Sequence, residues 1–322
     1  MRDPRYDLLF EPVQIGPVRT KNRFFQVPHC NGMGHVYPQT LARMRGIKAE
    51  GGWGVVCTEE VEISPLSEIA PHHEGRLWDE RDIPALRLMT DAVHAHGALA
   101  GIELMFNGYA TPNRYSRDIP IAPSHLPVRG SDPIQARTAT KRDIADVRRW
   151  HRNAALRARD AGFDLVYVYA GHDLGMPMHF LSRRTNRRSD EYGGSLENRA
   201  RLLRELIEDT KEAVGDRCGV VVRLAVDQLL GAGGITAESE GRDVIAMLAE
   251  LPDLWDVNIA DWSNDSQTAR FSAEGFQERY IAQVKSLTTK PVVGVGRYTS
   301  PDAMVRVIKS GIMDLIGAAR PS

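Results

Sequence analysis

The sequence predicts an α/β fold of the (β/α)8 TIM-barrel type, and three observations support that fold class. Eight apolar runs, each four to eight residues long and rich in β-branched side chains, recur without strict polar alternation. Strands that are covered on both faces have this pattern. Helical patterns separate the runs over about 300 residues, and no domain boundary is visible. This alternation favours a closed barrel over a doubly wound sheet.

The predicted strands, in chain order, span residues 23–29, 54–59, 99–104, 164–170, 219–226, 254–260, 291–296 and 315–320. The predicted helices between them span residues 40–50, 83–96, 141–161, 195–214, 237–251, 277–287 and 300–310. Ser195 and Ser300 are typical N-caps. Glycines stand where several helices end and a left-handed residue is needed, at Gly97, Gly162, Gly215 and Gly311. No helix is predicted after the last strand, so we expect a barrel without its last outer helix, taken from a longer protein.

Composition narrows the class of protein. The 322 residues are 42% hydrophobic and 26% charged, which excludes a disordered or low-complexity chain. A formal charge of -1 gives no electrostatic reason to expect nucleic acid or an anionic membrane as partner. No apolar stretch is long enough for a membrane helix, and the N-terminus does not resemble a secretory signal. The widely spaced cysteines 30, 57 and 218 argue against a disulfide scaffold or a metal site and favour a reducing cytoplasm.

Barrel enzymes carry their chemistry at the carboxyl ends of the strands, so polar residues there are the candidates. Cys30 follows the first strand, where a lone cysteine is either a small buried side chain or a nucleophile or cofactor attachment point. Glu60 follows the second strand, and Glu103 lies in the third. Tyr169 and His172 are three residues apart at the end of the fourth, within mutual reach, which favours an acid/base pair.

The later strands add a cation and two small-residue turns. Arg223 lies inside the apolar fifth strand, where burial requires a ligand or a carboxylate as partner. Trp262 and Asp265 follow the sixth strand and offer an aromatic wall and a carboxylate. The seventh and eighth strands each end in small residues followed by arginine, at Gly296-Arg297 and Ala319-Arg320. Exposed backbone N–H groups beside positive charge are typical of a barrel phosphate site.

Several motifs, taken together, resemble one enzyme family. Residues 188–199 (RSDEYGGSLENR) resemble the signature of the old yellow enzyme family of FMN oxidoreductases. Residues 24–30 (FFQVPHC), 48–53 (KAEGGW), 166–169 (VYVY) and 294–298 (GVGRY) are similar to its trimethylamine dehydrogenase branch, which includes dimethylamine, histamine and dimethylglycine-type dehydrogenases. The resemblance covers essentially the whole chain and implies a single FMN-binding barrel domain over residues 1–322.

The resemblance also implies roles for the strand-end residues. Cys30 would attach to flavin C6 as 6-S-cysteinyl-FMN, with Pro28 and His29 as cofactor contacts beside it. Glu103 would contact the flavin's polar edge, and Arg223 would lie near N1 and the C2 carbonyl. The phosphate would lie on Gly296, Arg297, Ala319 and Arg320. Tyr169, His172 and Asp265 would form a catalytic triad, with Trp262 as one wall of the substrate pocket.

The resemblance predicts an FMN-dependent dehydrogenase that oxidises a secondary or tertiary N-methyl amine to an iminium, which hydrolyses to an aldehyde and a dealkylated amine. Glu60 departs from the family, because the trimethylamine enzyme has a tyrosine there in a cation–π pocket. A carboxylate would instead pair with the amine or with a polar part of the substrate. Two alternatives stay open: an NAD(P)H-dependent ene-reductase of the same family, and a non-catalytic barrel fragment.

Partners are also implied by the resemblance. We expect a small-molecule amine substrate, a homo-oligomer, and electron transfer to a partner protein or to missing C-terminal modules. An iron–sulfur cluster is expected only in a longer native chain.

Overall fold

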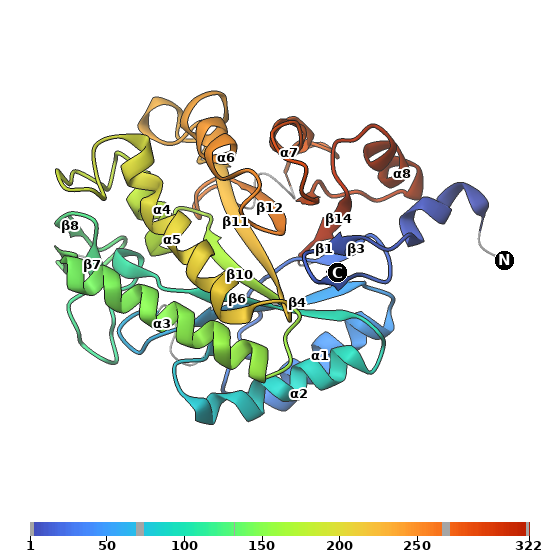
Figure 1. Cartoon of the computed structure of the whole chain (residues 1–322), viewed down its shortest axis with the longest axis horizontal. Helices are drawn as coiled ribbons and strands as arrows, with labels where there is room; N and C mark the ends of the chain where they lie inside the picture. Colours follow the sequence, from blue (N-terminus) through green and yellow to red (C-terminus); the bar gives the residue numbers. More distant parts are fainter. Residues whose placement is uncertain (1–2, 69–73, 132, 266–270, 320–321) are drawn as a thin grey trace.

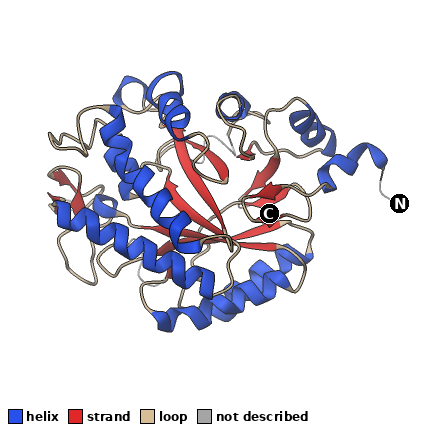
Figure 2. Ribbon diagram, viewed as in Figure 1, coloured by secondary structure: helices blue, strands red, loops and turns tan. Residues whose placement is uncertain are grey.

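A computed structural model of the chain describes residues 3–68, 74–131, 133–265, 271–319 and 322. Eight parallel strands close into a barrel, and helices surround it (Figures 1 and 2). The barrel strands, in chain order, are β3 (Phe24–Gln26), β4 (Val55–Glu62), β6 (Leu99–Met105), β10 (Leu165–Ala170), β11 (Gly219–Asp227), β12 (Leu254–Ile259), β13 (Val292–Val295) and β14 (Leu315–Ala318). Pairing of β14 with β3 and of β3 with β4 completes the ring. The predicted fold class is therefore confirmed.

The outer layer consists of helices that follow the strands. They are α1 (Pro38–Glu50), α2 (Ile83–His94), α3 (Lys141–Asp160), α5 (Leu196–Val214), α6 (Arg242–Leu248), α7 (Glu278–Lys285) and α8 (Pro301–Lys309). Ser195 accepts a hydrogen bond from the Asn198 N–H, and Ser300 accepts one from the Ala303 N–H, as N-caps do. The glycines predicted at helix exits all have positive φ, between 57° and 95°. None of the described helices combines the length and apolarity needed to cross a lipid bilayer.

Three features depart from the predicted elements. The loop after β6 contains a small sheet, β7 (Ile121–Ala122), β8 (Leu126–Pro127) and β9 (Gln135–Thr138), and the loop after β10 contains helix α4 (Met176–Leu181). The predicted helix 237–251 is interrupted by a π-helical turn at Ala237–Gly241, where Ser239 has non-helical backbone angles. A Cβ at Gly241 would lie 2.0 Å from the Val226 carbonyl oxygen. This close approach to β11 accounts for the irregular backbone at the beginning of the helix.

The amino end of the barrel is filled. A hairpin of β1 (Gln14–Ile15) and β2 (Val18–Arg19) brings the buried Ile15 into the apolar cluster inside the ring. Gly219 begins β11 so close to this hairpin that a Cβ there would lie 2.9 Å from the Ile15 carbonyl oxygen. A separate, larger cluster packs the strands against the outer helices. The two apolar layers support the polar carboxyl ends of the strands, where the candidate site lies.

Candidate active site

A cavity of about 1270 Å³ opens at the carboxyl ends of the strands. It collects every predicted site residue except Arg320, which falls outside the described residues. The predicted residues that line it are Pro28, His29, Cys30, Glu60, Glu103, Tyr169, His172, Arg223, Trp262, Asp265, Gly296, Arg297 and Ala319. Their sequence separation of almost 300 residues is therefore bridged by the closed ring of strands.

Strand register places the buried polar residues beside one another. Tyr169 on β10 is the register partner of Arg223 on β11, and Arg223 is in turn the partner of Asp256 on β12. The pairing of β4 with β6 shifts between Cys57 and Glu60, and the shifted register sets Glu60 opposite Glu103. Such a bulge re-aims side chains at the rim of a barrel. The register therefore groups two glutamates, one tyrosine and one arginine within a few strands.

Arg223 forms the positive centre of this group. Its Nη1 donates to the Pro28 carbonyl oxygen and to Glu103 Oε2, both at 3.1 Å, and its Nε lies 3.6 Å from Asp256 Oδ2. Burial alone would lower the pKa of Arg223, but Asp256 and Glu103 together raise it, so the side chain stays cationic. The sequence predicts either a ligand or a carboxylate as the partner of Arg223, and the structure places two carboxylates beside it.

Glu103 has a perturbed acidity because it shares this cation. Burial raises its pKa from 4.5 to about 7, while the charge and hydrogen bond of Arg223 act in the opposite direction. Burial also raises the pKa of Asp256, against the same pull from Arg223. One guanidinium cannot fully compensate two buried carboxylates. Glu103 therefore binds or releases a proton near neutral pH.

Tyr169, His172 and Asp265 form a chain of contacts facing the cavity. Tyr169 Oη lies 2.5 Å from His172 Nδ1, and His172 Nε2 lies 3.2 Å from Asp265 Oδ1. Burial raises the pKa of Tyr169 well above its usual value, with a smaller contribution from Glu103, so the phenol keeps its proton. Asn258 adds a third contact, since its Nδ2 lies 3.0 Å from His172 Nε2.

The two neighbours of His172 Nε2 select different imidazole tautomers. With the proton on Nε2, the ring donates to Asp265 and its Nδ1 accepts from the Tyr169 hydroxyl. With the proton on Nδ1, the ring donates to Tyr169 and its Nε2 accepts from Asn258. A change of tautomer therefore reverses the Tyr169 hydroxyl from donor to acceptor. This arrangement can move a proton between the cavity and the Asp265 carboxylate.

Arg129 joins the two loops that carry this chain of contacts. Its Nη2 binds Asp261 Oδ2 at 2.7 Å, and its Nη1 lies 3.4 Å from Asp173 Oδ2. His172 and Asp173 both have left-handed backbone angles, with φ of 52° and 57°. Non-glycine residues in that region are strained and persist where surrounding contacts fix them. The Arg129 contacts therefore help to hold His172 in its strained conformation.

Cys30 and Glu60 occupy the side of the cavity next to β4. The Cys30 side chain is exposed to the open cavity, with protein on its remaining sides. Burial and the nearby carboxylates of Glu60, Glu74 and Glu103 raise the pKa of its thiol. Glu60 is buried, accepts a hydrogen bond from Asn107 Nδ2 at 2.5 Å, and has a pKa well above its usual value because of burial and Glu74.

Two glycines in and after the last barrel strands, Gly296 and Gly317, line the cavity at points where the chain packs closely. A Cβ at Gly296 would lie 2.6 Å from the Tyr298 ring, and one at Gly317 would lie 2.9 Å from the Gly294 carbonyl oxygen. Arg297 has a φ of 54°, and the next helix, α8, begins at Pro301. Backbone without Cβ atoms beside an arginine suits a phosphate. These turns and the buried cation of Arg223 fit the phosphate and the polar edge of a flavin nucleotide.

Sequence reasoning missed several polar residues of the site. Asn258 and Asp256 lie inside the apolar sixth strand, at positions that face the barrel interior, and Asn107 follows the third strand. Arg45 lies on α1 among the buried residues Leu41, Ala42 and Ala49. A charge on the apolar face of a helix was the signal that could have revealed Arg45.

The sequence of the chain is similar to those of known flavin oxidoreductases. Residues 8–322 match the NADH:flavin oxidoreductase / NADH oxidase family. The chain is 45% identical to dimethylamine dehydrogenase of Hyphomicrobium sp. (strain x), over 100% of this chain and 45% of that protein.

Two solved structures resemble the chain at higher identity. A 6-hydroxypseudooxynicotine amine oxidase from Pseudomonas geniculata N1 gives a TM-score of 0.96 at 54% identity, covering 100% of this chain and 48% of that one. Histamine dehydrogenase from Rhizobium sp. 4-9 gives 0.94 at 53% identity, covering 99% and 46%. The chain thus spans about half the length of these relatives.

Proposed function

Because the chain belongs to the NADH:flavin oxidoreductase / NADH oxidase family, we propose that its barrel binds FMN and oxidises an amine. The observation that carries the proposal is the Tyr169–His172–Asp265 chain of contacts, which faces the same cavity as Cys30 and Arg223. The similar proteins named above support it, since they are an amine oxidase and two amine dehydrogenases.

FMN, when bound, supplies the acceptor for the hydrogen and two electrons that leave the carbon next to the amine nitrogen. Arg223 would hold the polar edge of the isoalloxazine, and the turns at Gly296, Arg297 and Ala319 would hold the phosphate. Arg223 contributes a fixed positive charge that stabilises an anion at that edge. Glu103 tunes this charge, because its protonation removes one of the two carboxylates that compensate Arg223.

The protein's own contribution to the oxidation is control of a proton. An amine gives up hydrogen from its α-carbon only when the nitrogen lone pair is free, so an ammonium substrate must first lose a proton. The Tyr169 oxygen can accept that proton while its own hydroxyl proton passes to His172 Nδ1. His172 is then an imidazolium, and Asp265 stabilises its charge at Nε2. Transfer of the Nε2 proton to Asp265 would leave Nε2 able to accept from Asn258. Water hydrolyses the iminium product to an aldehyde and a dealkylated amine.

The proposal includes a covalent bond between Cys30 Sγ and flavin C6. Forming this bond would remove the thiol hydrogen and the C6 hydrogen, and dioxygen would be the two-electron oxidant, leaving as hydrogen peroxide. Cys30→Ala should yield protein whose flavin is released by acid precipitation, whereas the flavin of the unmodified protein stays in the pellet. Release of flavin from both proteins would mean that Cys30 contacts the flavin without bonding to it.

Anaerobic flavin bleaching tests the activity. The flavin is mixed with methylamines, dimethylglycine, histamine or NADH. At least one amine should reduce it, and NADH should reduce it more slowly. Tyr169→Phe should slow reduction of the flavin by the amine about 100-fold or more, because proton control is lost, and should leave the amount of bound flavin unchanged. Rapid bleaching by NADH with no response to any amine would favour the ene-reductase alternative. Protein without any flavin would favour a non-catalytic barrel.

A further inference from the structure

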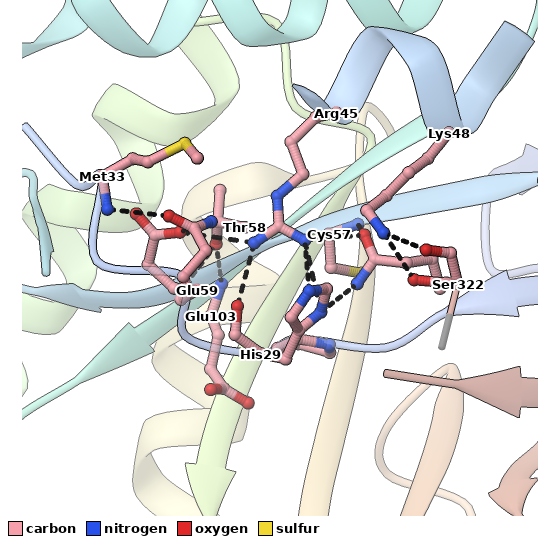
Figure 3. A network of polar contacts seen from close by, with 12 residues as sticks. His29, Met33, Arg45, Lys48, Cys57, Thr58, Glu59, Glu103 and Ser322 are labelled. Carbon is pink, nitrogen blue, oxygen red and sulfur yellow. Dashed lines mark hydrogen bonds and ion pairs between the residues drawn. The ribbon is translucent and has the colours of Figure 1, made fainter. Parts of the chain in front are cut away.

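A buried ion pair lies directly behind the loop that carries Cys30. Arg45 reaches inward from α1, and its Nη2 lies 3.3 Å from Glu59 Oε2 on β4. Both side chains are fully inaccessible to solvent. Figure 3 shows the Arg45 guanidinium between the His29 and Glu59 side chains. Neither residue lines the cavity, so neither would contact a substrate there.

The ion pair holds the loop on both sides of Cys30. Arg45 Nη2 donates to the His29 carbonyl oxygen at 2.9 Å. Glu59 Oε2 accepts from Asn31 Nδ2 at 2.6 Å. The residue before Cys30 and the residue after it are therefore fixed to the same pair of buried charges, while the thiol itself stays exposed to the cavity.

Further contacts extend this support along the loop. The Asn31 Oδ1 accepts from the Met33 N–H at 2.8 Å, and Arg223 donates to the Pro28 carbonyl oxygen at 3.1 Å. Arg45 Nη1 also lies 3.3 Å from His29 Nδ1. Burial and the neighbouring cation of Arg45 lower the pKa of His29 to about 3, so its ring is neutral and can accept a hydrogen bond.

Fold stability alone does not explain a buried pair of this kind. Moving two charges out of water costs more than a single contact usually returns, and well-packed apolar residues often stabilise a fold as well or better. Two polar atoms of the pair, Arg45 Nε and Glu59 Oε1, make no hydrogen bond within the described part of the chain. The atoms that do make contacts hold the loop around Cys30.

We infer that Arg45 and Glu59 are positioning residues that direct Cys30 Sγ for covalent attachment of FMN. The inference rests on the proposed function, because it assumes that the cavity receives FMN. The two residues act through the loop backbone and the Asn31 side chain, not by touching the flavin. Displacement of a reacting atom by about 1 Å slows a reaction roughly 100-fold. Loss of the Arg45–Glu59 ion pair should therefore slow covalent attachment more than it weakens FMN binding.

The test separates attachment from binding. Flavin-free protein is produced in riboflavin-depleted cells and mixed with FMN, and the rate at which flavin becomes acid-precipitable is measured. FMN affinity is measured by fluorescence quenching in the Cys30→Ala background. Arg45→Met should lower the attachment rate about 10- to 100-fold and keep FMN affinity within about threefold of the parent. Arg45→Lys keeps the charge but cannot form the same fork of contacts, so its rate should be intermediate.

Arg43→Met is the matched control, because Arg43 lies on the same helix but is exposed. It should attach FMN at the rate of the unmodified protein. Attachment by Arg45→Met at that same rate would overturn the inference. A fall in rate that only follows a fall in FMN affinity would also overturn it, since a purely structural role predicts that result. Arg45→Lys provides the same comparison if Arg45→Met does not fold.

A second measurement tests the Arg45–Glu59 pair even if the unmodified protein forms no covalent bond to FMN. That result would contradict the proposed attachment but would leave open whether the pair positions Cys30. Iodoacetamide alkylation of Cys30 in the flavin-free protein is followed by peptide mass spectrometry. Arg45→Met should be alkylated faster at pH 8, because a released loop reduces the burial of the thiol and moves it away from the carboxylates, and both disfavour the thiolate. Equal alkylation rates in Arg45→Met and Arg43→Met would show that the pair does not position Cys30.

Discussion

Glu103→Gln offers a direct test of the electrostatics around Arg223. Burial raises the pKa of Glu103 from 4.5 to about 7, so the folded protein keeps a proton that the unfolded chain loses above pH 4.5. The stabilising contribution is fully present below pH 4.5 and is lost as the pH rises through 7. The difference of roughly 2.5 pH units corresponds to about 3 kcal/mol of unfolding free energy. Glutamine resembles the protonated carboxyl group and cannot lose a proton.

The variant should therefore be about 1 kcal/mol more stable than its parent at pH 5 and about 3 kcal/mol more stable at pH 8. At about 2 °C per kcal/mol for a chain of this size, the expected rise in midpoint at pH 8 is about 6 °C. Thermal unfolding of flavin-free protein in the Cys30→Ala background, followed by circular dichroism from pH 5 to pH 8, measures it. Glu208→Gln on the exposed face of α5 serves as control and should show no such pH-dependent gain.

The opposite sign would refute this reasoning. If the ion pair with Arg223 outweighs burial, the ionised carboxylate stabilises the fold. Glu103→Gln would then lose stability at pH 8, by up to about 3–5 kcal/mol if Arg223 is left uncompensated. A difference that is the same at pH 5 and pH 8 would mean that Glu103 does not titrate in this range.

Three further predictions concern the cavity. Glu60→Tyr should speed flavin reduction by trimethylamine and slow reduction by a cationic diamine, because an aromatic face replaces a carboxylate; an unchanged substrate ranking in stopped-flow reduction would place Glu60 outside the substrate's path. Gly296→Val should weaken FMN binding about 10- to 100-fold, since its side chain would collide with the Tyr298 ring. Gly233→Val, where a Cβ meets open space, should bind FMN normally, and equal affinity of both variants would contradict the phosphate site. Arg129→Met should slow amine oxidation about tenfold and shift its pH profile without changing FMN affinity, because the His172 loop loses support; an unchanged pH profile would mean that other contacts hold the loop.

The barrel, and most of the residues that gather at its cavity, could be predicted from sequence because both depend on local patterns; the roles of these residues stay predictions. Buried parallel strands are continuous apolar runs, and the ends of such strands meet on one rim whatever their separation in sequence. Tyr169 and His172 lie three residues apart on one strand end, so their contact required no knowledge of the rest of the fold. The resemblance to the family then supplied roles that the spacing alone did not.

Contacts between segments far apart in the chain could not be predicted from the sequence. The pairing of Arg223 with Glu103 and Asp256 depends on the register of β6, β10, β11 and β12 relative to one another. The position of Glu60 opposite Glu103 depends on a bulge in β4 that no local pattern indicates. The interrupted helix at Ala237–Gly241 arises from the close approach of Gly241 to β11, which is a tertiary constraint. The small sheet after β6 contains strands of two to four residues, too short for periodicity to indicate them.

The filled amino end of the barrel determines how the molecule exchanges small molecules with solvent. With Ile15 and its apolar neighbours packed inside the ring, the ring interior gives the described cavity no passage to the amino end of the barrel. Under the proposed function, an amine could not cross the barrel from end to end. It would enter, and its product would leave, on the cavity's own side of this apolar filling.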